Sequence, residues 1–177
     1  MYLYSILMSD DIVSSINKNI DYLLDLMPEI KYMIGFDQKH PHHHLDVWNH
    51  TLLALSLSPK DFEVRLSLLL HDIGKPFSYQ EGEIRHFKGH PKVSSEISKK
   101  ILARIGYDKE FVEKISNYIE LHDIKITEEN IKSNPRMYLK LYKIQYCDAL
   151  AHHPDKLDKR KEYLENTKKL LIKKANL

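Results

Sequence analysis

Residues 58–76 read SPKDFEVRLSLLLHDIGKP, and this stretch decides the fold class. It begins as helices often do, because a serine at Ser58 suits the N-cap, proline suits the first turn and an acid follows three positions on. The apolar residues that lead to His71 recur at helical spacing. We therefore predict a very apolar helix that ends at His71, with Gly74 letting the chain turn away.

The same period governs the rest of the chain, which has only 5 glycines and 7 prolines. Apolar residues recur every three or four positions instead of alternating as in a strand. The further helices are expected at residues 10–27, 45–57, 90–105, 111–122, 135–150 and 155–174. An exposed loop with a short hairpin is expected at 74–89. The sequence thus predicts an all-α, compact orthogonal helical bundle, a single domain over 1–177 with helices 10–27 and 155–174 packing on the core.

Composition limits the function classes. A chain of 177 residues with 42% hydrophobic and 29% charged residues is long enough to bury a core. The net charge of +2 is too small for the broad positive field of a dedicated nucleic-acid binder. The single cysteine, Cys147, excludes an internal disulfide and a sulfur-rich metal site. Without a signal-peptide pattern or a membrane-length apolar run, we expect a cytoplasmic protein with no membrane partner.

The pair His71-Asp72 is the first candidate for chemistry. A His-Asp dipeptide is not by itself specific for a metal site and occurs twice in this chain, but here it follows a very apolar helix. Two adjacent polar groups in that position are costly to bury unless each has a partner, and a cation satisfies both. Metal ligation is the favoured interpretation, and a hydrogen-bonded structural pair is the alternative.

His50 and Asp148 are expected to complete a ligand set. His50 should point inward, since leucine or alanine follows it at three, four and seven positions, although a core histidine is the alternative. Asp148 lies in a helical segment with little free charge, where an inward carboxylate requires either a cation or a tyrosine hydroxyl. Mixed imidazole and carboxylate ligands suit one or two divalent ions of manganese, iron, cobalt, nickel or zinc.

Further residues extend this predicted site. His90 and His122 lie at helix ends, as His71 does, and either bind a second ion bridged by Asp72 or cap the surface. Lys75 should reach a bound phosphate, unless it is a solvated loop lysine. One of the histidines at positions 40, 42, 43 and 44 is expected to line the pocket mouth as a substrate-binding residue, and His44 is the favoured candidate.

Other features are assigned no chemistry. His152, His153 and the lysines from Lys156 onward are interpreted as a solvated helix start and face. The chain has no glycine-rich phosphate loop, no Gly-x-Ser-x-Gly elbow and no Cys-His pair, so no side chain is a candidate nucleophile.

Taken in order, His50, His71-Asp72 and Asp148 resemble the signature of the HD-domain metal-dependent phosphohydrolases, and HDIGKP at 71–76 is a strong local match. The resemblance covers most of the chain. Within this family, the chain most resembles the HD domain attached to some bacterial CCA-adding tRNA nucleotidyltransferases. The segments that carry it are HHLDVWNHTLLAL from His43, HFKGHPKVS from His86 and CDALAHHP from Cys147.

The resemblance also has departures. Nothing before His40 matches the nucleotidyltransferase head of those enzymes, so the resemblance implies a stand-alone HD module that does not add CCA. It implies phosphatase, nucleotidase or 2′,3′-cyclic phosphodiesterase chemistry. The chain lacks the Gly-Tyr-Pro motif of cyclic-di-GMP phosphodiesterases, so that substrate is not expected.

The predicted function is therefore a metal-dependent hydrolase of nucleotide-type phosphomonoesters or 2′,3′-cyclic phosphodiesters. An ion held by the four signature residues would polarise the phosphoryl group and lower the pKa of a water that attacks phosphorus, with Asp72 and Lys75 as catalytic residues. Two alternatives remain at this level: a di-iron HD oxygenase, and a non-catalytic module that binds nucleotides or tRNA through the basic last helix. Acidic residues on that helix weaken the RNA interpretation, and the sequence carries no signal for the oligomeric state.

Overall fold

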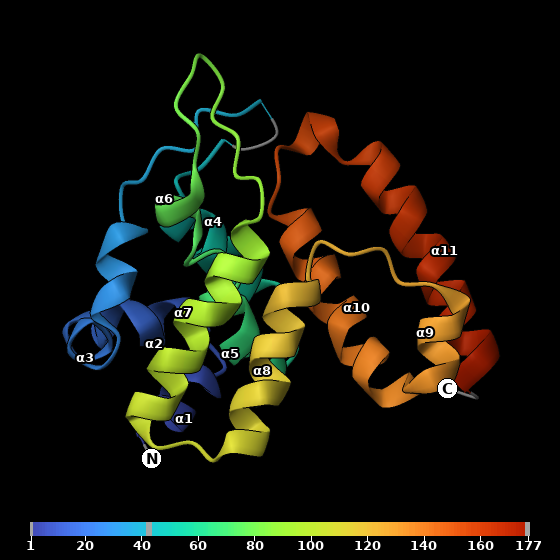
Figure 1. Cartoon of the computed structure of the whole chain (residues 1–177), viewed down its shortest axis with the longest axis horizontal. Coiled ribbons are helices and arrows are strands. Elements are labelled where there is room, and N and C mark those ends of the chain that lie inside the picture. Colours follow the sequence, from blue (N-terminus) through green and yellow to red (C-terminus); the bar gives the residue numbers. More distant parts are fainter. Residues whose placement is uncertain (1, 42–43, 176–177) are drawn as a thin grey trace.

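The computed structural model describes residues 2–41 and 44–175, and over these ranges the fold is all-α, as predicted (Figure 1). The helices are α1 (Tyr2–Leu7), α2 (Ile12–Lys18), α3 (Ile20–Leu26), η1 (Pro28–Tyr32), α4 (Val47–Ser56), α5 (Phe62–Leu70), α6 (Lys75–Ser78), α7 (His90–Ile105), α8 (Lys109–Leu121), α9 (Glu128–Ser133), α10 (Pro135–Leu150), η2 (Pro154–Lys156) and α11 (Asp158–Ala175). None of them is long and apolar enough to cross a membrane.

Helix α5 lies at the centre of the core. Every residue from Val64 to Leu70 is buried, because α4, α8 and α10 all pack against this helix. Burial of a leucine side chain stabilises a fold by roughly 1.5 to 3 kcal/mol, so the leucines of α5 anchor the bundle. Since the helix is covered on all sides, the residues that follow it, His71 and Asp72, emerge inside the protein.

The N-terminal region differs from the prediction of one helix over 10–27. The chain forms two helices there, α2 and α3, separated at Asn19, whose backbone leaves the helical conformation. The side chain of Asn19 donates to the carbonyl of Ser15, so the asparagine closes the end of α2 instead of continuing it. The predicted start is confirmed, because the Asp11 carboxylate accepts the backbone N–H of Ser14. Helix α1 was not predicted.

The start of α5 also differs from the prediction. Asp61, not Ser58, is the N-cap, and its carboxylate accepts the backbone N–H groups of Glu63 and Val64. The hydroxyl of Ser58 donates to the Leu55 carbonyl and accepts from the buried guanidinium of Arg65. Ser58 therefore belongs to the preceding turn.

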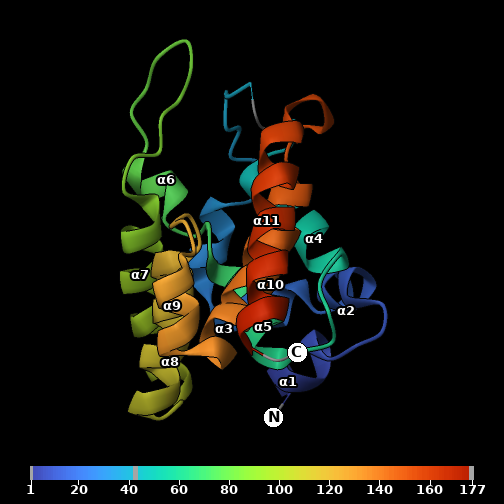
Figure 2. The same ribbon diagram turned by 90° about the vertical axis from the view of Figure 1, so that its right-hand side faces the viewer.

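The segment 74–89 is only partly a loop. It begins with the short helix α6 and then forms a hairpin closed by one isolated antiparallel bridge between Gln80 and His86. The hairpin projects from the same end of the bundle as the loop that follows η1 (Figures 1 and 2). Arg85 links the two loops, because its backbone N–H donates to the Lys39 carbonyl and its guanidinium lies over the rings of Phe36 and Tyr79. Together these loops form one wall above the core.

Two helix pairs complete the frame around α5. Helices α7 and α8 pack against each other, joined by a turn at Gly106, which has the positive φ of 96° that favours glycine. Helix α10, capped at its start by Asn134 as the sequence indicated, packs against α5 and α4 on one side and α11 on the other. Helix α11 begins at Asp158, because η2 occupies the first residues of the predicted helix.

Candidate metal centre

Ends of five segments meet near the centre of the bundle and bring the six predicted ligands together. His50 lies in α4, His71 and Asp72 follow α5, His90 is the first residue of α7, His122 caps the end of α8, and Asp148 lies in the last turn of α10. All six side chains are buried. Residues separated by up to 98 positions in the chain therefore share one polar cluster inside an apolar core.

The four histidines point the same ring nitrogen at this cluster. Each uses Nδ1 to contact a backbone carbonyl: Ala151 for His50 at 3.2 Å, Leu68 for His71 at 2.7 Å, Phe87 for His90 at 3.0 Å and Ile119 for His122 at 2.6 Å. A carbonyl only accepts, so Nδ1 carries the proton in every case. The lone pair of each neutral ring is then on Nε2, the arrangement that metal-ligating histidines adopt.

Asp72 lies between two pairs of histidines. Its Oδ2 is 3.3 Å from Nε2 of His71 and 3.7 Å from Nε2 of His50. Its Oδ1 is 3.1 Å from Nε2 of His90 and 4.0 Å from Nε2 of His122. The two oxygens of this one carboxylate therefore face separate histidine pairs, as a ligand that bridges two ions does.

Asp148 closes the first of these two groups. Its Oδ1 lies 2.9 Å from Nε2 of His50 and 3.5 Å from Nε2 of His71. Ligand atoms that are each about 2.1 Å from one metal ion lie roughly 3 to 4 Å apart. Nε2 of His50 and Nε2 of His71 lie 2.9 to 3.7 Å from the facing oxygens of Asp72 and Asp148, which fits that spacing. The distances among Asp72, His90 and His122 are 3.1 to 4.0 Å and fit it too. His152 is also close enough to share an ion with His50 and Asp148.

Unpartnered polar atoms support a cation in the cluster. Among the described residues, Nε2 of His71 and both carboxylate oxygens of Asp72 are fully buried and make no well-aligned hydrogen bond. The ammonium of Lys75, 2.8 Å from Oδ2 of Asp72, offsets part of the charge of that carboxylate, and Oδ1 and the His71 nitrogen still lack a hydrogen bond. In the second group, Nε2 of His90 and Nε2 of His122 face each other at 3.2 Å, where two lone pairs repel unless a proton or a metal ion lies between them. Buried polar atoms without partners are costly, and an ion in each group satisfies all of them. The residues present thus fit one or two divalent ions.

The pKa values of His71 and Asp72 also indicate that the cluster favours a positive charge beside its carboxylates. Burial lowers the pKa of His71, but the carboxylates of Asp72 and Asp148 outweigh burial and raise it to about 10. Burial raises the pKa of Asp72, yet His71 and Lys75 hold it well below its ordinary value. A proton on His71 thus serves as the missing cation when no metal is bound, and a metal ion competes with it for Nε2.

Lys75 lies deeper than a solvated loop lysine would. It is 4% exposed, and its ammonium is 2.8 Å from Oδ2 of Asp72 and donates to Oε1 of Gln38 at 2.8 Å. Gln38 is itself held by a hydrogen bond from its Nε2 to the Leu45 carbonyl. Lys75 therefore has a fixed position beside the carboxylate that faces both histidine pairs.

Gly74 sets the distance between Asp72 and His90. Its backbone dihedrals, φ −83° and ψ −14°, are ordinary, so the turn at this position does not itself require glycine. A Cβ atom at this position would lie 2.5 Å from the backbone nitrogen of Ser94 and 2.9 Å from the carbonyl oxygen of His90. The backbone N–H of Gly74 also donates to the Ser94 hydroxyl. Glycine is required because the segment after α5 touches the backbone of α7.

Three residues near the cluster were missed in the sequence. His152 was interpreted as solvated but is 5% exposed, with Nδ1 donating to the Asp148 carbonyl and its ring 5.2 Å from that of His50. Asp123 places its carboxylate oxygens 3.6 Å from Nε2 of His90 and 3.8 Å from Nε2 of His122. Arg160 of α11 lies 3.8 Å from Oδ2 of Asp148. His152 stands four residues after Asp148, a helical spacing that could have revealed it.

His44 does not lie where it was expected. It is exposed and its ring packs against that of His153, and it lines neither of the cavities that reach the cluster. The loop before α4 places His44 near the start of η2, where His153 lies. His40, from the same run, does line the cavity beside Asp72, and His42 and His43 lie outside the described residues.

A cavity of about 440 Å³ opens beside Asp72. Four of its lining residues are lysine or arginine, and the acidic ones are the candidate ligands and Asp123. The lining comprises His40, Asp72, Lys75, Arg85, His86, Phe87, Lys88, Gly89, His90, Pro91, His122, Asp123, Asp148, His152 and Arg160. Cations around a concave surface attract anionic ligands, so this cavity suits a phosphorylated molecule.

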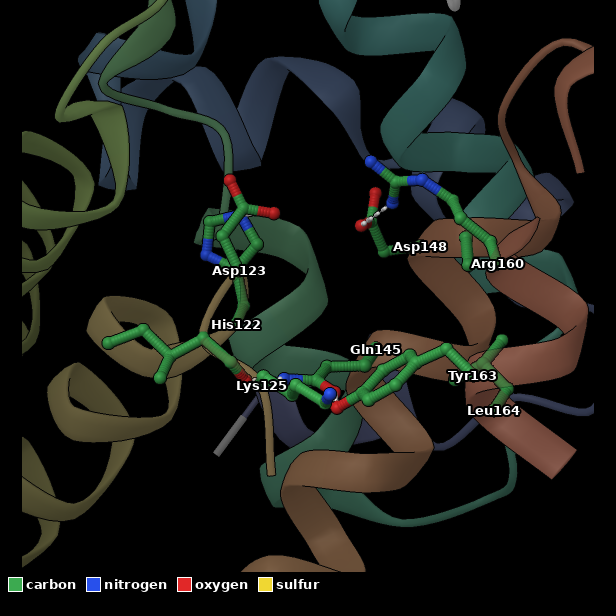
Figure 3. Close-up of a pocket in the computed structure, with 10 residues that line it drawn as sticks. His122, Asp123, Lys125, Gln145, Asp148, Arg160, Tyr163 and Leu164 are labelled. Atoms are coloured by element: carbon green, nitrogen blue, oxygen red, sulfur yellow. Dashed lines mark hydrogen bonds and ion pairs between the residues drawn. The ribbon is translucent and has the colours of Figure 1, made fainter. Parts of the chain in front are cut away.

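A second cavity, of about 270 Å³, lies between the turn after α8, α10 and α11 (Figure 3). It shares His122, Asp123, Asp148 and Arg160 with the first cavity. Figure 3 shows His122 and Asp123 on one side of it and Asp148 with Arg160 on another. The candidate metal centre therefore has two adjoining approaches.

Residues 42–173 match the HD domain family. The CC-adding tRNA nucleotidyltransferase of Thermus thermophilus is 36% identical over 123 residues, which are 64% of this chain and 28% of the relative. The A-adding tRNA nucleotidyltransferase of Deinococcus radiodurans is 30% identical over 120 residues, 63% of this chain and 27% of the relative. A multifunctional CCA protein from Hahella chejuensis is 29% identical over 146 residues, 80% of this chain and 33% of the relative.

The chain spans about a third or less of the length of these relatives, so their whole activities do not transfer to it. The family match covers most of the chain and includes all six candidate ligands. This chain belongs to the HD domain family, which is part of the superfamily of metal-dependent phosphohydrolases whose signature its histidines and aspartates match.

Proposed function

We propose that this protein is a metal-dependent phosphohydrolase that removes phosphate from nucleotide-type phosphomonoesters or opens 2′,3′-cyclic phosphodiesters. One observation carries the proposal: the two oxygens of Asp72 face two histidine pairs, and all four rings direct Nε2 toward this carboxylate. His50, His71, Asp72 and Asp148 would hold one ion, and Asp72, His90 and His122 would hold a second. Asp123 lies close enough to join the second group.

The charge of the adjoining cavity supports an anionic substrate. Arg85 and Lys88 lie on the hairpin side of the cavity, and Arg160 lies on the α11 side. Arg85 is held in place by a hydrogen bond to Oε2 of Glu81 and by the rings of Phe36 and Tyr79. Since a fixed guanidinium loses little side-chain entropy on binding, Arg85 is suited to orient a phosphate.

The residues of the chain position the reaction. When bound, divalent ions would polarise the phosphoryl group and lower the pKa of a bound water toward neutrality, so that hydroxide is available as the nucleophile. The carbonyl contacts at Nδ1 hold the four imidazoles in the required tautomer. Burial of Asp72 and Asp148 excludes competing water from the ligand side of the site.

Lys75 has two roles in this proposal. In the free protein its ammonium offsets part of the charge of Asp72 at 2.8 Å. It also lines the cavity, so it can donate to a phosphoryl oxygen while Gln38 keeps its position. A fixed ammonium of this kind stabilises negative charge that develops on the phosphoryl oxygens in the transition state.

Release of phosphate tests the proposal directly. Purified protein supplied with manganese, cobalt, nickel or ferrous iron is incubated with p-nitrophenyl phosphate, nucleoside monophosphates and 2′,3′-cyclic nucleotides. We expect turnover that a chelator abolishes and that Asp72→Asn lowers by at least a hundredfold. Asp21→Asn, on the exposed side of α3, is the matched control and should keep full activity.

Two results would overturn the proposal. One is undiminished turnover in the metal-loaded Asp72→Asn protein. The other is consumption of oxygen with ferrous iron and no release of phosphate from any of these substrates, which would assign the same ligands to oxygenase chemistry.

A further inference from the structure

The cavity of about 270 Å³ beside the candidate metal centre is not needed to hold ions or phosphate. Besides the residues it shares with the first cavity, its walls are Ile124 and Lys125 from the turn after α8, Gln145 and Ala149 from α10, and Tyr163 and Leu164 from α11. Figure 3 shows Tyr163 and Gln145 meeting across the floor, with Leu164 beside Tyr163. The floor and walls thus come from three separate segments that frame the metal centre.

The polar groups of the floor are already paired. Nε2 of Gln145 donates to the Ile124 carbonyl at 2.7 Å, and Oε1 of Gln145 accepts from the Tyr163 hydroxyl at 3.1 Å. The Tyr163 hydroxyl in turn accepts the backbone N–H of Ile126 at 2.9 Å. This chain of hydrogen bonds fixes the floor and leaves it to offer mainly the aromatic ring and the amide carbons. A ligand binds such a surface by burying apolar area.

Arg160 marks the boundary between the two cavities. Its guanidinium lines both of them and lies 3.8 Å from Oδ2 of Asp148, while its side chain stays 42% exposed. A phosphoester held at the metal centre can therefore contact Arg160 while the group attached to its phosphate lies in the neighbouring cavity. The volume suits one ring-bearing group, since pockets for whole drug-sized ligands begin at about 300 Å³.

We propose that this cavity is the leaving-group subsite and that it takes the ring-bearing alcohol part of the substrate, as in a nucleoside monophosphate. The inference rests on the proposed hydrolase function for the position of the phosphate, but the cavity itself is tested by binding. Ile124 supplies an apolar wall at the rim and contacts solvent over half its surface, so it can be shortened without disturbing the core.

The test compares two isoleucines with the same exposure. Ile124 lines the cavity, whereas Ile172 on α11 lies outside both cavities, and each is 53% exposed. Binding of a non-hydrolysable phosphonate analogue of adenosine 5′-monophosphate, the nucleotide probe, and of inorganic phosphate is measured by calorimetric titration of the full chain in the presence of manganese. We expect Ile124→Ala to weaken binding of the nucleotide about fivefold, because part of an apolar contact is lost, and to leave binding of phosphate unchanged. Ile172→Ala should change neither.

The outcomes separate the subsite from the catalytic proposal. The subsite is overturned if the wild-type protein binds the nucleotide no more tightly than inorganic phosphate. It is equally overturned if Ile124→Ala weakens both ligands alike or neither of them. Selective weakening of the nucleotide supports the subsite even in a preparation that releases no phosphate with any metal, a result that would count against the hydrolase alone.

Discussion

Replacement of Gly74 by alanine should destabilise the fold and separate Asp72 from His90. The added Cβ would lie 2.5 Å from the backbone nitrogen and 2.8 Å from the hydroxyl oxygen of Ser94, so backbone atoms of α7 must move. Overpacking of this kind costs about 1 to 3 kcal/mol, and loss of the hydrogen bond to Ser94 about 1 kcal/mol more. Because alanine adopts these dihedrals readily, the smaller entropy of the unfolded chain returns about 0.4 to 1 kcal/mol.

The net loss should therefore be about 1 to 3.6 kcal/mol, measured by urea denaturation of metal-free protein. Ser94→Ala, which removes only the hydrogen bond, should lose about 1 kcal/mol. Gly82→Ala is the matched control, because a Cβ there meets only the nearby backbone of Ile84 in an exposed loop, at 3.1 Å or more. If Gly74→Ala unfolds at the same urea concentration as the control, the close contact with α7 does not set this geometry.

Three further predictions follow from buried or shared groups. Arg65→Leu should lower the free energy of unfolding by roughly 2 to 4 kcal/mol in urea, since it leaves the buried Leu7 carbonyl and the partly buried Ser9 carbonyl unpaired. A loss below that of Ser94→Ala would contradict this. With a chelator present, stability should peak near pH 6.5. The contribution of His71, whose pKa is raised to about 10, is lost as the pH rises from 6.5, and that of His152, whose pKa burial lowers to about 4, is lost as the pH falls from 6.5. Constant stability from pH 6.5 to 10 would show that His71 holds no extra proton. Arg160→Gln should raise KM about tenfold, whereas Arg136→Gln, at the far end of α10, should leave KM unchanged; equal KM values in both variants would remove Arg160 from the binding site.

Residues carried by long apolar helices could be predicted from the sequence. His71 and Asp72 follow a helix that is buried on every side, and Asp148 lies in a helix with few other charges, so burial itself points to a shared cation. The placement of His90 beside Asp72 could be guessed only as a convergence of helix ends. It depends on the close contact between Gly74 and Ser94, which joins positions twenty residues apart.

Other features depend on tertiary contacts that leave no periodic signal. Gln38 lies in a histidine-rich loop, and only the folded chain brings its amide to Lys75. Asp61 caps α5, and Ser58 instead accepts a hydrogen bond from Arg65, a residue seven positions away. The break at Asn19 is decided by one side-chain hydrogen bond within an otherwise continuous apolar stripe.

The number of bound ions tests the central claim most directly. Metal-free protein is titrated with manganese and the bound metal is counted by equilibrium dialysis, alongside the thermal unfolding temperature. Wild-type protein should bind two ions per chain and gain stability with each, the double variant His90→Ala, His122→Ala should bind one, and Asp72→Ala should bind fewer than the wild type with much weaker affinity. The same number of ions in all three proteins, or none in the wild type, would contradict the account that Asp72 joins two histidine pairs into one metal centre.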